Sequence, residues 1–171
     1  GVDLGVYYPV KSSLRIKKNI LYAGRMLHSK GVLEFVKTAE ILFHLDQFNF
    51  LIAGWDYNNP DALSDRELND LAKNKAVKYL GFVENMPDLL RDMDLLVLPS
   101  QYPEGIPKIL LEAAASEVPI LTSDYAGARQ VVKRNLTGYI SSSVEPKDLA
   151  KQIIEIFENT DEFERIKKNS R

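Results

Sequence analysis

Six short apolar runs divide this chain of 171 residues, and helical spacing of apolar residues follows most of them. Because the runs lack alternation of apolar and polar residues, they are typical of strands buried on both faces of a parallel sheet. The runs lie at residues 19–25, 48–54, 77–82, 94–99, 119–123 and 137–140. Strands that alternate with helices predict an α/β fold, a doubly wound parallel sheet of the Rossmann-like type. No internal repeat or linker is visible, so we expect a single domain over residues 1–171.

Helices are expected at residues 31–45, 63–74, 86–91, 107–116, 127–133 and 146–157. The last of these has the clearest signals, because Pro146 stands in its first turn and Leu149, Ile153 and Ile156 fall on one face. The charged stretch 161–171 also has helical propensity. The chain opens on Gly1 rather than methionine, and we therefore expect a piece of a longer protein.

Composition narrows the class of function. A net charge of −2 argues against nucleic acid or an anionic membrane as the main partner. The chain has no cysteine, which excludes disulfides, thiol catalysis and cysteine-based zinc sites. Its two histidines, His28 and His44, are isolated, so we expect no metal site. With no signal-peptide pattern or bilayer-spanning apolar run in these residues, a cytoplasmic protein is expected.

The stretch 101–112 joins the fourth strand to a helix and has the features of an anion site. In α/β sheets, ligands bind outside the carboxyl ends of the strands, where such loops gather. Pro107 suits the first helical turn, and the amides of Gly105, Ile106 and Lys108 are then available to an anion. Gly105 also lets a ligand approach the backbone closely. We expect a phosphate group at this helix start.

Two carboxylates, Glu104 and Glu112, flank the expected anion site. They would repel a phosphate, so their expected task is to accept hydrogen bonds from the hydroxyls of a sugar or ribose. The competing interpretation is that strand–loop–helix joints of this composition are common and that surface glutamates are mostly solvated.

Arg25 and Lys30 follow the first strand, and sheet topology brings their loop to the same edge as residues 101–112. Two cations and a helix N-terminus can hold a diphosphate without a metal ion. At 4 Å, each cation–phosphate contact contributes up to about 4 kcal/mol before desolvation, at an effective dielectric constant near 20. Alone, Arg25 and Lys30 would be read as solvated loop charges.

These motifs together resemble those of retaining glycosyltransferases of the GT-B type, family 4, also called glycosyl transferases group 1. The stretch from Glu104 to Ala113 is similar to the two-glutamate signature of that family, and Gly24-Arg25-Met26 with Lys30-Gly31 to its diphosphate-binding loop. Further similar segments occur in family order at residues 1–9, 81–83, 99–100, 119–120 and 137–139. The resemblance covers nearly the whole chain.

The resemblance implies the nucleotide-sugar (donor) binding domain, the C-terminal half of an enzyme whose N-terminal acceptor domain is not in this chain. It implies three catalytic residues: Arg25 and Lys30 hold the diphosphate and offset charge on the leaving group, and Glu104 contacts the transferred sugar. Glu112 would hold the ribose. The other implied donor-binding residues complete the diphosphate cradle or border the base; they are Gly105, Ile106, Pro107, Lys108, Phe82 and Val83.

The resemblance further implies a reaction without metal or cofactor. A sugar would pass from a nucleoside diphosphate, UDP or GDP, to a glycan or lipid acceptor in glycan, polysaccharide or glycolipid synthesis. The implied partners are the donor, the acceptor and the N-terminal domain of the same full-length protein, with no nucleic acid. The full-length protein would be cytoplasmic or peripheral to the inner face of the membrane. Alone, this domain is expected to bind the donor nucleotide and to transfer nothing. Because a partner domain would cover the ligand-binding edge, we expect an exposed apolar patch there.

Two positions depart from the family pattern. Glu117 stands where a glycine usually follows the helix, so we expect that helix to end without a glycine cap. Gln130 stands where a glutamate commonly follows Gly127. Two alternatives stay open, namely a nucleotide-sugar epimerase or phosphorylase of the same architecture, and a non-catalytic nucleotide-binding module.

Overall fold

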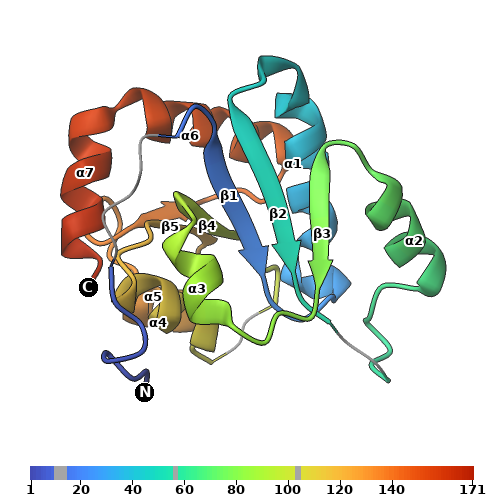
Figure 1. Cartoon of the computed structure of the whole chain (residues 1–171), viewed down its shortest axis with the longest axis horizontal. Helices are drawn as coiled ribbons and strands as arrows, with labels where there is room; N and C mark the ends of the chain where they lie inside the picture. Colours follow the sequence, from blue (N-terminus) through green and yellow to red (C-terminus); the bar gives the residue numbers. More distant parts are fainter. Residues whose placement is uncertain (10–14, 56–57, 103–104) are drawn as a thin grey trace.

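The computed structural model describes residues 1–9, 15–55, 58–102 and 105–171, and its centre is a six-stranded parallel sheet (Figure 1). The strand order is β3-β2-β1-β4-β5-β6, so the order reverses between β1 and β4. The strands are β1 (Lys18–Ala23), β2 (Phe48–Ala53), β3 (Val77–Gly81), β4 (Leu95–Leu98), β5 (Ile120–Ser123) and β6 (Tyr139–Ser141). The predicted doubly wound α/β fold is confirmed.

Burial explains why the central strands lack alternation. All residues of β4, β5 and β6 are buried, as are the last four of β1, so these strands have helices on both sides. The edge strand β3 is only partly covered, and Lys78 is exposed on it. Two aromatic side chains fill the space between the sheet and the first helix: the rings of Tyr22 and Phe35 lie 5.7 Å apart.

The helices agree with the expected ones to within a few residues. They are α1 (Val32–Leu42), α2 (Asp65–Lys73), α3 (Met86–Arg91), α4 (Lys108–Ala115), α5 (Ala126–Val131), α6 (Pro146–Glu158) and α7 (Thr160–Asn169), with short 3-10 turns η1 (His28–Lys30) and η2 (Phe43–Leu45). The crossovers from β1 to β2 and from β4 to β5 run in opposite directions, so α1 and α4 cover opposite faces of the sheet. Among the described residues, no helix is long and apolar enough to cross a membrane.

The start and the end of α4 depart from the usual pattern. Pro107 is the residue before the first helical one, with an extended backbone, rather than part of the first turn. At the other end, the Val118 amide donates to Ala113 O at 2.9 Å and the Glu117 amide to Ala114 O at 3.1 Å. These two bonds define a Schellman motif, whose left-handed position usually holds glycine. Here Glu117 adopts it, with φ of 55°, and the expected helix end without a glycine cap is confirmed.

Candidate functional site

The reversal of strand order between β1 and β4 marks the edge at which α/β sheets bind ligands. Two segments flank this point: residues 24–31 after β1, and the described residues 99–102 and 105–107 after β4, which together are called the β4 loop. The loops after β2 and β3 lie at the same end of the sheet, because all strands are parallel. The sequence motifs with candidate ligand-binding residues therefore gather here.

The two segments are joined through their backbones. The Gln101 amide donates to Ser29 O at 2.7 Å, and the Ser100 hydroxyl lies 3.4 Å from the same oxygen. Gly31 has φ of 74°, and a Cβ atom placed on it would lie 2.1 Å from Pro99 O. Only glycine fits this conformation and this approach without strain. The turn η1 is thereby held against the β4 loop.

Arg25 and Lys30 line one cavity of about 490 Å³ at this place. Tyr102, from the β4 loop, lines it as well, so the structure brings the two cations to that loop. The other described lining residues are Leu27, Ser29, Asn59 and Asp61. The other described candidates lie outside the lining of this cavity; they are Gly105, Ile106, Pro107, Lys108, Glu112, Phe82 and Val83. Two cationic side chains and the carboxylate of Asp61 border it, so an anionic group fits on the side of Arg25 and Lys30.

Sequence reasoning missed Asp61, which also borders this cavity. Its carboxylate accepts hydrogen bonds from the Ser29 hydroxyl and from the Ser29 amide at 3.0 Å. These bonds lower the pKa of Asp61 below its usual value, with the hydroxyl as the first cause. The carboxylate thus fixes the backbone of η1 from the outside. The available signal was the Asn- and Asp-rich composition of residues 56–61 directly after a strand.

Glu112 lies on α4 and is buried, with a side chain that is 8% exposed. Its Oε1 atom accepts a hydrogen bond from the Tyr7 hydroxyl at 2.8 Å and lies 3.1 Å from Lys108 Nζ. Sequence reasoning placed Glu112 beside the anion site but missed Tyr7 as its partner. Desolvation, followed by the hydrogen bond to Glu112, raises the pKa of Tyr7 to about 12.

The remaining predicted residues lie around the start of α4 and the end of β3. Gly105 and Ile106 are exposed and Pro107 is half-buried in front of α4. Phe82 is 74% exposed, whereas Val83 packs partly against the hydrophobic core. The prediction for Glu104 concerns a residue outside the described part of the chain.

Exposed apolar side chains occur at this end of the sheet, where a patch is expected. Large apolar side chains are exposed in the segments that follow β2, β3 and β4; they are Trp55, Phe82, Tyr102 and Ile106. Exposed apolar side chains also occur elsewhere among the described residues, for example Ile16, Phe43 and Leu136, so a contact surface at this edge stays a prediction.

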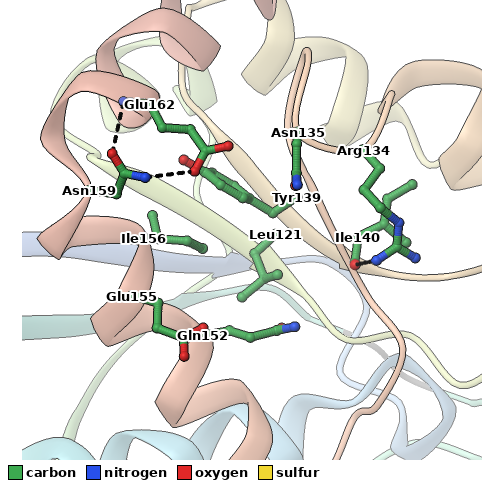
Figure 2. A pocket seen from close by; sticks show the side chains of 10 residues that line it. All are labelled: Leu121, Arg134, Asn135, Tyr139, Ile140, Gln152, Glu155, Ile156, Asn159 and Glu162. Atoms are coloured by element: carbon green, nitrogen blue, oxygen red, sulfur yellow. Dashed lines mark hydrogen bonds between the residues drawn. The ribbon is translucent and has the colours of Figure 1, made fainter.

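A second cavity, of about 310 Å³, lies between α6, α7 and the strands β5 and β6 (Figure 2). Glu162 lies at one end of it, where the Asn159 side-chain amide donates to its Oε2 at 3.1 Å. Arg134 lies at the other side and donates to Ile140 O at 2.7 Å. None of the residues predicted for the site lines this cavity, among those that the structure describes. The candidate site is therefore the one at the β1–β4 edge.

Comparisons with known proteins agree with the fold and with the family resemblance. The family model of glycosyl transferases group 1 matches residues 11–171. The N,N'-diacetylbacillosaminyl-diphospho-undecaprenol alpha-1,3-N-acetylgalactosaminyltransferase of Campylobacter jejuni is 32% identical over 171 aligned residues, covering 93% of this chain and 44% of that protein. Spore coat protein SA of Bacillus subtilis is 28% identical, covering 100% of this chain and 51% of that protein.

Solved structures show the same fold at lower identity. The C-terminal domain of a glycosyl transferase group 1 family protein (LpcC) from Francisella tularensis superposes with a TM-score of 0.81 at 22% identity, covering 99% of this chain and 94% of that chain. Anabaena HepE in complex with UDP gives 0.84 at 22% identity, covering 99% of this chain and 50% of that one. The chain thus spans about half the length of the curated relatives it matches. With a family model that matches nearly all of it, this chain belongs to the glycosyl transferases group 1 family.

Proposed function

We propose that this chain is the donor-binding domain of a retaining, metal-independent glycosyltransferase of family 4, which takes a sugar from a nucleoside-diphosphate sugar. The observation that carries the proposal is the cavity at the β1–β4 edge, with Arg25 and Lys30 on its wall and the β4 loop beside it. Family membership supports a transferase, and the edge is the one at which this fold class binds ligands.

Arg25 and Lys30 have the proposed task of holding the diphosphate. As the bond to the sugar breaks, negative charge grows on the leaving diphosphate, and fixed cations stabilise it more than they stabilise the substrate. The backbone bond between Ser29 and Gln101 keeps these cations on the β4 side, so little reorganisation is needed when the ligand arrives. HepE, which has the same fold, binds UDP, and this supports a nucleoside diphosphate as the ligand.

The remaining proposed contacts concern the two ends of the donor. Glu112 would accept hydrogen bonds from the ribose, and Phe82 and Val83 would border the base. Glu104 would contact the transferred sugar. The amides of the segment from Gly105 to Lys108 would complete the diphosphate site at the start of α4.

The acceptor side of the reaction is proposed to come from an N-terminal domain of the same full-length protein. Two observations support this: the relatives are about twice as long as this chain, and apolar side chains are exposed around its ligand-binding edge. Two Campylobacter jejuni relatives are named for transfer to undecaprenol-linked glycans. We therefore propose a glycan or lipid acceptor, and a cytoplasmic enzyme that works at the inner face of a membrane.

Calorimetric titration of the 171-residue chain with UDP, GDP and ADP tests this proposal. We expect one of them to bind, and Arg25→Ala and Lys30→Ala each to weaken its binding by at least about tenfold, the equivalent of 1.4 kcal/mol. Arg66→Ala, which removes an exposed cation of α2, is the matched control and should leave binding unchanged.

A wild-type chain that binds none of the three nucleotides would refute the proposal and favour a module that has kept the fold but lost its chemistry. A longer parent protein should then transfer sugar from a donor panel with retention of the anomeric configuration, read by NMR of the product. Activity that persists in EDTA would support metal independence, and epimerised donor in place of transferred sugar would identify an epimerase.

A further inference from the structure

We propose that Tyr7 is a positioning residue for Glu112 and thereby sets how strongly this domain selects a ribose over a deoxyribose. The inference rests on the proposed function of Glu112 in binding the donor ribose. Tyr7 lies 105 positions before Glu112 in the sequence, and the two side chains meet through the hydrogen bond of 2.8 Å.

The two donors on Glu112 converge on the same oxygen. Tyr7 Oη and Lys108 Nζ both contact Oε1, and among the described residues no donor lies on Oε2. An ionised carboxylate accepts several hydrogen bonds over its two oxygens. With Oε1 engaged, Oε2 is the oxygen that remains for the hydroxyls of a ligand. Rotation of the carboxylate would break the Tyr7 bond, so that bond selects one orientation.

Tyr7 is the better placed of the two donors. The Lys108 side chain is 74% exposed, and such an ion pair is weak because water and salt screen it. Tyr7 is half-buried and packs against the hydrophobic core, so its hydroxyl has few other orientations. Burial together with Glu112 raises the pKa of Tyr7 to about 12, so the hydroxyl stays a donor over the physiological pH range.

The segment that presents Tyr7 is itself anchored. Its backbone turns at Asp3, and the backbone carbonyl of Asp3 accepts a hydrogen bond from the Tyr7 amide at 2.9 Å. Arg91 of α3 donates to Val6 O at 3.1 Å, and its guanidinium lies 4.2 Å from the centre of the Tyr8 ring. These contacts hold residues 6–8 between α3 and α4. The Tyr7 hydroxyl therefore approaches Glu112 from a fixed backbone rather than from a loose tail.

The test compares Tyr7→Phe with Tyr8→Phe, which removes a neighbouring hydroxyl that does not contact Glu112. Binding is measured by calorimetry with whichever of UDP, GDP and ADP binds best, and with its 2′-deoxy and 3′-deoxy analogues. We expect Tyr7→Phe to weaken binding of the ribonucleotide by about 10- to 150-fold, the range of a lost hydrogen bond to a charged group. Tyr7→Phe should leave the affinity for the deoxy analogue that binds the wild type more weakly nearly unchanged. The selectivity for ribose over deoxyribose should therefore fall. Tyr8→Phe should change neither.

A double-mutant cycle separates positioning from a general packing effect. In a Glu112→Gln background the charged acceptor is gone, and Tyr7→Phe should then cost less than twofold. A packing role would give the same loss in both backgrounds, and melting curves report whether each variant is folded. Equal affinity of the wild type for ribo- and deoxynucleotides, a measurement that needs no variant, would overturn the proposal.

The outcomes distinguish this inference from the proposed function. If Glu112→Ala and Arg25→Ala weaken nucleotide binding but Tyr7→Phe leaves affinity and ribose selectivity unchanged, the role of Tyr7 is wrong and the donor site stands. If the wild-type chain binds no nucleotide, both are wrong.

Discussion

Replacing Gly31 with alanine tests whether the contact between the β1 and β4 segments determines the site. A left-handed alanine costs about 1–2 kcal/mol relative to the usual backbone regions. Its Cβ would also lie 2.1 Å from Pro99 O, a backbone atom that cannot rotate away. Overpacking of this kind costs a further 1–3 kcal/mol or so. Gly31→Ala should therefore destabilise the chain by about 2–4 kcal/mol, after a small gain from restricting the unfolded chain.

Gly81 supplies the matched control. It also has positive φ, 67°, but a Cβ atom on it would meet nothing within 4 Å. Gly81→Ala therefore has the conformational cost without the clash, and should lose only about 1 kcal/mol. For a domain of this size, each kcal/mol shifts the melting temperature by about 2–4 °C. Calorimetric melting should place Gly31→Ala about 5–15 °C below the wild type, and Gly81→Ala about 2–4 °C below it.

Nucleotide affinity is a second measurement that separates Gly31→Ala from Gly81→Ala. Gly31→Ala must move η1 away from Pro99, which displaces Lys30 relative to the β4 loop, and we expect it to weaken nucleotide binding below its melting temperature. Gly81→Ala should not. Equal melting temperatures for the two variants would show that a Cβ atom at position 31 does not clash with Pro99. That result would contradict the close contact between the β1 and β4 segments.

Three further predictions concern stability. Glu117→Gly should raise the melting temperature by about 2–4 °C by relieving the left-handed backbone at the end of α4, whereas Glu117→Ala, which keeps a Cβ atom, should not. Ser64→Ala removes the capping box of α2 and should cost about 1 kcal/mol in chemical denaturation. Burial raises the pKa of Tyr7 and Tyr139 to about 12, above the unfolded value of 10. The stabilisation that these two tyrosines contribute is therefore fully present below pH 10 and is lost as the pH rises through 12. The free energy of unfolding should fall less steeply with alkaline pH in Tyr7→Phe, and an unchanged slope in that variant would contradict the Tyr7 assignment.

The fold could be predicted from the sequence because its signals are local and redundant. Apolar runs such as 94–99 are too short and too continuous for anything but strands buried on both faces, and each misplaced boundary is only one to three residues off. The residues on either side of the β1–β4 edge followed from topology, since parallel strands put their carboxyl ends together.

The contacts of individual side chains could not be predicted in the same way. Asp61 reaches Ser29 from a loop 32 positions away, and Tyr7 reaches Glu112 across most of the chain. Such pairs depend on rotamers and on the path of irregular segments, and these have no periodicity to read. Glu117 was the exception, because a non-glycine residue after a helix is visible in the sequence itself.

The position of Tyr7 has a practical consequence for anyone who trims this protein. The family model begins to match at residue 11, so a boundary drawn there would discard the tyrosine while retaining every strand and helix. Such a shortened protein would keep the sheet and the helices that cover it. Its measured affinities would nevertheless describe a Glu112 that has lost the hydroxyl nearest to its carboxylate.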